Sequence, residues 1–223
     1  ITIGGMAKGA GMLAPGLATM LVVITTDALV ESIQLDRALR AATRLTFDRL
    51  DSDGAMSTND QVTLMASGAS GLSPDETAFG AALTSLCADL AQQLLADAEG
   101  SSHDITITVT GAHSEADAVK IGRAVARNNL FKAAMFGQDP NWGRVLAAIG
   151  TVDAEFDVYA ADVSMNGVRV CHAGAPDRPR SEVDLGPRAI EVLIELNVGS
   201  DQASIWTNDL THAYVHENSA YSS

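Results

Sequence analysis

The sequence has 223 residues, 47% of them hydrophobic, and carries 28 acidic against 14 basic side chains, a net charge of −14. That length allows a sizeable core, in one large domain or two small ones. The acidic balance argues against nucleic acid and anionic lipid as partners, and no apolar run is long enough to span a membrane.

The start of the chain and its cysteines bear on where the protein works. The first residue is Ile1 rather than Met, and no signal-peptide pattern follows it, so we expect a processed chain or a fragment in the cytoplasm. Cys87 and Cys171 give no disulfide framework and are expected to be small buried hydrophobes. Cysteine and histidine are too few and too scattered for a metal site, so no metal and no cofactor are expected.

The first predicted elements flank a loop rich in glycine and proline. Residues 1–5 end a strand, and the loop runs into a buried strand at 19–25. Thr19 therefore stands where loop becomes sheet, with its hydroxyl accessible on one side and fixed in direction on the other. A nucleophile needs this placement, although an ordinary strand-start threonine has it too.

Helical and strand patterns alternate up to residue 100. An apolar stripe predicts a helix at 32–50 with Ser32 as its cap, and a strand follows at 61–66. Residues 51–60 form a turn, because their oxygen spacing does not fit a calcium loop. A long helix is predicted at 74–98. Glu99 then stands at a helix C-terminus, where a carboxylate opposes the dipole and is either solvated or held by a cation.

The second half of the chain mixes short strands with helices. The predicted elements are a strand at 104–111, a helix at 114–128 capped by Ser114, an apolar segment at 130–136, a helical stretch at 145–149, a hairpin around Asn166-Gly167, strands at 190–198 and 202–207, and a short helix at 209–218. Trp142 is expected to pack in the core. Irregular alternation with hairpins favours an α+β fold of layered sheets and helices, with two subdomains dividing near residue 150 as one option.

A threonine hydroxyl needs a base to take its proton. None of the five histidines stands at a telling spacing from an Asp or Ser, which argues against a histidine-based triad. The other route uses the α-amine of the nucleophile itself, which requires cleavage between Ala18 and Thr19. The small Ala18 leaves the scissile carbonyl open, and a turn at Pro15-Gly16 could strain that peptide. The freed amine would have a pKa near ~8.

Four segments resemble one enzyme family, the ornithine acetyltransferases (glutamate N-acetyltransferases) of arginine biosynthesis. They are KGAGM…ATML…TDA within 8–28, ADAEG at 96–100, GQDPNWGRV at 137–145 and YVHENSAYSS at 214–223. The resemblance covers essentially the whole chain. Members of the family are made as a longer precursor, so it implies that residues 1–18 end an upstream alpha chain and residues 19–223 are the complete beta chain.

The resemblance implies a self-processing acyltransferase of the N-terminal-nucleophile type. After cleavage between Ala18 and Thr19, the Thr19 hydroxyl would take the acetyl group of N-acetylornithine and pass it to glutamate, with ping-pong kinetics. Acetyl-CoA serves some relatives as a further acetyl donor. The substrate-binding residues implied are Lys8, Thr19, Glu99, Asn218 and Ser223. The segment 57–60 lies near the active site in the family.

The resemblance also implies partners. The upstream alpha chain would supply the oxyanion hole from a threonine-glycine pair, and two alpha and two beta chains would form a heterotetramer. The cations available for an anionic substrate are Lys8, Arg123 and Arg144. Two other functions stay open: a self-processed amidase or aminopeptidase that uses water as acceptor, and a non-catalytic subunit that binds an amino acid.

Overall fold

A computed structural model describes residues 1–9, 20–55 and 59–220. They form two compact units, each described by itself. Unit 1 consists of residues 1–50 and 55–98, and unit 2 consists of residues 51–54 and 99–223, within the described ranges. Residue 150, where the sequence left a division as an option, lies inside unit 2.

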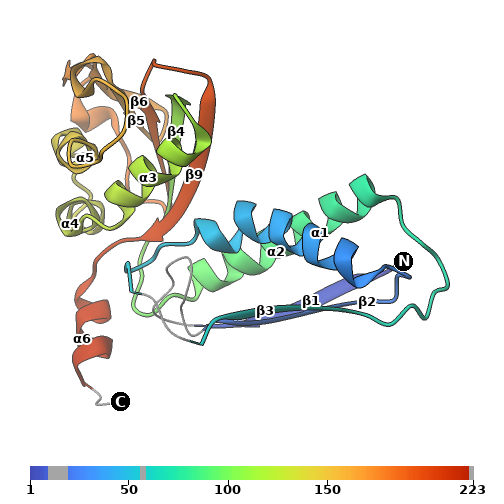
Figure 1. The fold of residues 1–223 in the computed structure, drawn as a ribbon. Helices are drawn as coiled ribbons and strands as arrows, with labels where there is room; N and C mark the ends of the chain where they lie inside the picture. The colour runs from blue at the N-terminus through green and yellow to red at the C-terminus, as the bar shows by residue number, and fades with distance from the viewer. Residues whose placement is uncertain (10–19, 56–58, 221–223) are drawn as a thin grey trace. The chain divides into compact units, whose positions relative to one another are not determined.

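Unit 1 is a three-stranded sheet with two helices on one face (Figure 1). Its strands, in sheet order, are β1 (Ile3–Lys8), β2 (Leu21–Thr26) and β3 (Gln61–Ala66). Strand β2 pairs antiparallel with β1 and parallel with β3. The helices are α1 (Ser32–Leu45) and α2 (Glu76–Ala96), and a short 3-10 helix, η1 (Phe47–Arg49), follows α1.

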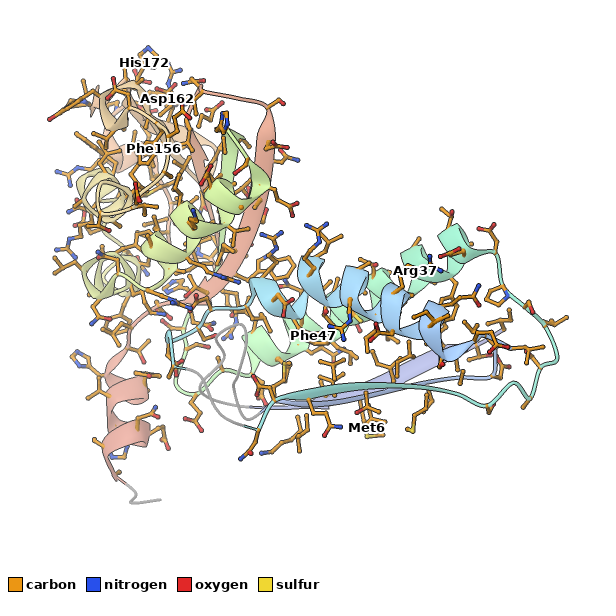
Figure 2. The ribbon with its side chains drawn as sticks, viewed as in Figure 1. Met6, Arg37, Phe47, Phe156, Asp162 and His172 are labelled. Atoms are coloured by element: carbon orange, nitrogen blue, oxygen red, sulfur yellow. The ribbon has the colours of Figure 1, made fainter. Side chains whose placement is uncertain are left out.

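The two faces of this sheet differ in burial. Val22, Ile24 and Thr26 of β2 are buried, while the residues between them are exposed. The buried face packs against apolar residues of α2, namely Phe79, Leu83, Cys87, Leu90 and Leu94. The other face exposes Met6, Leu21, Val23 and Met65, and Figure 2 shows Met6 pointing away from the helices.

Unit 2 is built on a six-stranded mixed sheet in the order β7-β6-β5-β8-β4-β9. The strands are β4 (Asp104–Ala112), β5 (Asp162–Met165), β6 (Val168–His172), β7 (Ala175–Pro176), β8 (Ala189–Glu195) and β9 (Asp201–Asn208). The helices are α3 (Glu115–Ala126), α4 (Asn129–Phe136), α5 (Trp142–Ile149) and α6 (His212–Ala220), with 3-10 turns η2 (Val158–Ala160) and η3 (Arg180–Glu182).

The core of unit 2 lies between this sheet and α3, α4 and α5. Strand β4 runs parallel to β8 and antiparallel to β9, and Ile105, Ile107 and Val109 are fully buried on it. Helix α3 approaches β9 closely at Gly122, where an added Cβ would lie 2.7 Å from the Ile205 side chain. Cys171 is buried in the same core, and Cys87 is buried in unit 1, as the sequence predicted.

Most element types agree with the sequence, and the differences fall at the ends of helices and strands. Strand β1 continues to Lys8, beyond the predicted end at Gly5, because residues 6–8 still pair with β2. Helix α1 is capped by Glu31 rather than Ser32, and it ends at Leu45 because Thr46 leaves helical geometry. Helix α5 begins three residues before the predicted stretch, because the Asn141 side chain accepts the Arg144 N–H and starts the helix there. The apolar segment 130–136 is the helix α4.

Candidate functional site

The predicted site residues are distributed over both units. Ala18, Thr19 and Ser223 lie outside the described residues. Lys8 ends β1 in unit 1, opposite Leu21, and its side chain is exposed. Glu99 and Asn218 belong to unit 2.

The backbone of Met20 is held at the start of β2. Its N–H donates to the Asp60 carboxylate over 2.8 Å, and its carbonyl accepts the Gln61 N–H over 2.9 Å. Burial raises the pKa of Asp60, and the Met20 N–H acts against that rise. Asp60 belongs to the segment expected near the active site, of which residues 57 and 58 lie outside the described ranges, and it thus bonds to the residue that follows Thr19 in the sequence.

Unit 1 contains a hollow of about 410 Å³ beside Lys8. It is lined by the end of β1 and the last turns of α2, namely Ala7, Lys8, Gly9, Leu90, Gln93, Leu94 and Asp97. Its volume falls in the range of small-molecule sites. Lys8 lies at the rim of this hollow on the edge strand, and its pairing with Leu21 directs its Cβ to the open face of the sheet, away from α2.

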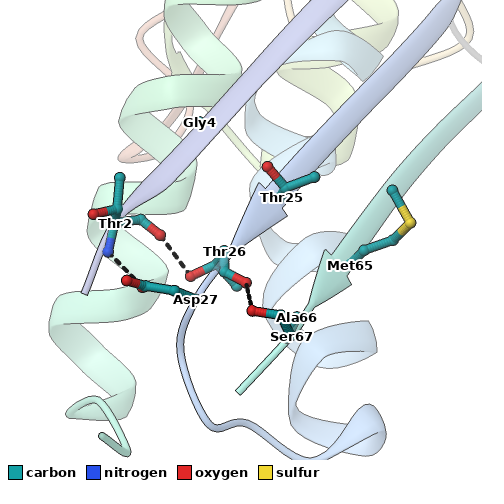
Figure 3. A pocket seen from close by; sticks show the side chains of 8 residues that line it. All are labelled: Thr2, Gly4, Thr25, Thr26, Asp27, Met65, Ala66 and Ser67. Atoms are coloured by element: carbon teal, nitrogen blue, oxygen red, sulfur yellow. Dashed lines mark hydrogen bonds between the residues drawn. The ribbon is translucent and has the colours of Figure 1, made fainter. Parts of the chain in front are cut away.

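A second hollow, of about 500 Å³, lies at the other end of the same sheet (Figure 3). Its polar groups bond to one another: the Thr2 N–H donates to Asp27 over 2.7 Å, and the Thr26 hydroxyl donates to the Thr2 carbonyl over 2.8 Å. Ser67 likewise donates to the Thr26 carbonyl over 3.4 Å. None of the predicted site residues within the described ranges lines it, so the hollow beside Lys8 is the better candidate of these two.

In unit 2 the turn at Glu99-Gly100 lies against the start of α6. Gly100 has a φ of +65°, and a Cβ there would overlap the Tyr214 backbone nitrogen and lie 2.7 Å from the Ala213 carbonyl carbon. The Thr211 hydroxyl donates to the Gly100 carbonyl over 2.5 Å. Glu99 lies in this turn and Asn218 lies on α6. The two segments that carry these predicted substrate contacts are therefore held together.

A buried lysine in unit 2 was missed by the sequence reading. Lys132 of α4 is only 4% exposed, and its ammonium donates to the Ser52 carbonyl and, over 3.1 Å, to the Thr207 hydroxyl. Burial lowers the pKa of Lys132 to about 8, while the charges of Asp53, Asp51 and Asp209 act to raise it. The available signal was a lone charge in the apolar run LFKAAMF, since a buried charge needs partners.

The segment 51–54 belongs to unit 2 and supplies two of those carboxylates. The Asp51 carboxylate is fully buried and accepts from Arg127 Nε over 2.7 Å. Burial raises the pKa of Asp51 even though Arg127 acts to lower it. Asp53 accepts the Tyr214 hydroxyl over 3.2 Å. The turn that the sequence predicted at 51–60 thus provides anchoring carboxylates.

One of the five histidines is buried beside an aspartate that lies far away in the sequence. His103 is 6% exposed, and its Nδ1 lies 2.8 Å from the Asp209 carboxylate, which also accepts the Ser102 hydroxyl. Burial acts to raise the pKa of Asp209, but the bonds from Ser102 and His103 lower it overall. In a catalytic triad the histidine stands between serine and aspartate. Here both converge on the carboxylate, so these residues form a structural clamp.

Comparison with known proteins decides the family. The model of the ArgJ family matches residues 1–223. This chain belongs to the ArgJ family. The resemblance seen in the sequence is thereby confirmed.

Several ArgJ relatives match closely, and the chain spans less than two thirds of their length. The arginine biosynthesis bifunctional protein ArgJ of Streptomyces coelicolor is 60% identical over 222 residues, which are 100% of this chain and 58% of the relative. The protein of the same name from Thermobifida fusca is 61% identical over 221 residues, 99% of this chain and 58% of the relative.

A solved ArgJ structure has the same fold. The crystal structure of the arginine biosynthesis bifunctional protein from Bacillus halodurans matches with a TM-score of 0.87 and 34% identity, over 91% of this chain and 100% of that chain. This match confirms the predicted class, a layered α+β fold of mixed sheets and helices of the N-terminal-nucleophile type.

Other residues that the sequence singled out in this ArgJ chain have structural contacts. Trp142 packs against the core of unit 2, as expected. The Arg144 guanidinium donates to the Leu130 carbonyl over 2.5 Å, joining α5 to α4. The described ranges contain no group of three or more His, Cys, Asp or Glu side chains placed to hold a metal ion. None of the described helices is both long and apolar enough to cross a membrane.

The close approach at Gly100 leads to a stability prediction. We expect Gly100→Ala to lower the free energy of unfolding by about 2–4 kcal/mol, because the methyl group would displace α6 from the turn and a positive φ disfavours alanine. Denaturant titration measures the loss. Gly71→Ala is the matched control, since Gly71 has the same φ of +65° with nothing within 4 Å of the added Cβ. An equal loss in both variants would contradict the packing argument.

Proposed function

We propose that this chain, together with the upstream part that its relatives contain, transfers the acetyl group of N-acetylornithine to glutamate in arginine biosynthesis. The observation that carries the proposal is the match to the ArgJ family over residues 1–223. The Streptomyces coelicolor and Thermobifida fusca relatives are named arginine biosynthesis bifunctional proteins. Because this chain spans 58% of each, the complete enzyme needs the remainder.

The chemistry follows from an N-terminal threonine. Cleavage between Ala18 and Thr19 frees an α-amine with a pKa near ~8, which accepts the hydroxyl proton during attack. The Thr19 oxygen bonds to the acetyl carbon, the amide C–N bond breaks, and the proton passes to the departing ornithine nitrogen. The amine of glutamate then attacks acetyl-Thr19, and the ester C–O bond breaks to restore the hydroxyl.

The lengths of the matched chains support the cleavage step. This chain covers 58% of the Streptomyces coelicolor relative. In contrast, 91% of this chain is enough to cover the whole of the solved Bacillus halodurans chain. Residues 19–223 would amount to about 92% of this chain. Cleavage ahead of Thr19 would leave a chain of nearly the same size as the solved ArgJ chain.

The substrate contacts follow from charge and placement. Lys8, exposed at the end of β1 in unit 1, suits the carboxylate of an amino acid. Glu99 suits an ammonium group, while Asn218 and Ser223 offer neutral hydrogen bonds. The attachment of the Glu99-Gly100 turn to the helix that carries Asn218 supports a shared role for these two residues.

The same proposal assigns partners and location. The upstream alpha chain of the precursor supplies the oxyanion hole, and two alpha and two beta chains form a heterotetramer in the cytoplasm. The proposal assigns no cofactor or metal to turnover, and an assay with acetyl-CoA in place of N-acetylornithine tests whether acetyl-CoA also donates the acetyl group. Native mass spectrometry of the purified complex measures the subunit composition.

The test uses the full precursor expressed in one piece. Intact mass and N-terminal sequencing should find a chain that starts at Thr19, and incubation with N-acetylornithine alone should add one acetyl group to it. Glutamate should then release N-acetylglutamate. Release of acetate to water at an equal rate would indicate an amidase or aminopeptidase, and an uncleaved chain that binds ornithine would indicate a non-catalytic subunit.

A further inference from the structure

Helix α6 is held to unit 2 through its first turn. None of its residues, His212–Ala220, is buried. Within the described part of the chain, two of its side chains bond to or stack on other elements: the His212 ring packs edge-on against Phe136 with centroids 5.5 Å apart, and the Tyr214 hydroxyl donates to Asp53. The remainder of the helix, including Asn218, therefore depends on this turn for its position.

Tyr214 stands where several of these contacts meet. Its backbone N–H donates to the Thr211 hydroxyl over 2.9 Å, and that hydroxyl donates in turn to the Gly100 carbonyl. Its hydroxyl reaches the Asp53 carboxylate over 3.2 Å. Asp53 also acts on the buried ammonium of Lys132, so the phenol is fastened to the charged interior of unit 2.

The same residue lies between two predicted substrate contacts. Burial raises the pKa of Tyr214 to about 12, and the negative charges of Asp53 and Glu99 contribute to the rise. The phenol is therefore protonated at neutral pH and can donate a hydrogen bond. The contribution of Glu99 also means that its carboxylate acts electrostatically on the phenol. On its other side, the Asn218 side-chain amide donates to the Tyr214 carbonyl over 3.0 Å. Any movement of Tyr214 would shift Asn218 relative to Glu99.

We infer that Tyr214 is a positioning residue for the amino-acid substrate: its hydrogen bond to Asp53 fixes the first turn of α6 so that Asn218 and Glu99 face the substrate together. This inference rests on the proposed function, which makes these two residues substrate contacts. Tyr214 itself need not touch the substrate or the reacting atoms. Its loss should weaken binding rather than slow the chemical step.

The test compares Tyr214→Phe with the wild type in the full precursor after maturation. Phenylalanine keeps the ring and removes only the hydroxyl. We expect the ornithine Kd by titration calorimetry and the KM for N-acetylornithine to rise about ten-fold, the scale of a lost bond to a charged acceptor, with kcat within two-fold. Hydrogen exchange of the 212–220 amides should become faster. Tyr159→Phe is the matched control, since Tyr159 is 78% exposed, and it should change none of these values.

Three results would overturn the inference. They are an unchanged Kd and KM in Tyr214→Phe, a fall in kcat with KM preserved, and an exchange rate of α6 equal to that of the wild type. The calorimetric arm separates this inference from the proposed function, because ornithine binding needs no turnover. A wild-type protein that binds ornithine without transferring acetyl groups would refute the proposed function alone, and one that does not bind ornithine would refute both.

Discussion

Replacing Thr19 by alanine in the full precursor should abolish both chain cleavage and acetyl transfer. Alanine has no hydroxyl, so it can neither attack the Ala18 carbonyl to start the cleavage nor form the acetyl ester. We expect kcat/KM to fall by about a thousand-fold or more, as for the removal of other covalent nucleophiles. Gel electrophoresis should show one uncleaved chain, and the product assay should show no N-acetylglutamate above the background.

Two variants make this result interpretable. Thr19→Ser keeps a hydroxyl beside the same amine, so it should still be cleaved and should keep measurable transfer. Thr25→Ala removes an exposed threonine of β2, the strand that follows Thr19 in the sequence, and should keep both activities, because its hollow is lined by none of the predicted site residues that the structure describes. Undiminished transfer by Thr19→Ala would refute the covalent mechanism, and transfer lost equally in Thr25→Ala would point to damage to the strand instead.

Local elements were predictable because their signals are local. The apolar run around Val22 to Ile24 predicts the strand β2, although the structure buries only alternate residues of it and leaves Leu21 and Val23 exposed on the other face. The Ser114 side chain accepts the Asp117 N–H at the start of α3 as predicted, and Asn166-Gly167 turns the chain between β5 and β6. Each of these features depends on a few neighbouring residues, so the sequence alone carries it.

The site required information that no local pattern contains. Asp209 and His103 are 106 positions apart, and Lys132 is 80 positions from Ser52. Spacing could not pair them, because only the packing of unit 2 does so. Family resemblance supplied Glu99 and Asn218, but it gave no reason why the turn and the helix that carry them should meet. That reason is the contact between Gly100 and Tyr214.

A second large effect is expected at Lys132. We expect Lys132→Met to lower the free energy of unfolding at pH 7 by about 2–4 kcal/mol. The variant removes the cation that faces Asp51, Asp53 and Asp209, and it leaves the Ser52 carbonyl without its donor. Lys120→Met on α3 is the matched control, because the Lys120 side chain is 59% exposed and its pair with Asp117 is worth little.

The pH dependence of stability distinguishes a buried charge from simple packing. The pKa of Lys132 is about 8 in the folded chain, against 10.5 for an ordinary lysine. Between these two values the unfolded chain binds more protons than the folded chain, so this group makes stability rise with pH there, by on the order of 3 kcal/mol in total. Methionine cannot titrate, so the rise should be missing from Lys132→Met and present in Lys120→Met. The contrary result is that the free energy of unfolding changes with pH in the same way for Lys132→Met and the wild type between pH 8 and about 10. The ammonium would then be solvated, and Lys132 would not be joined through Asp53 to Tyr214 in a buried network.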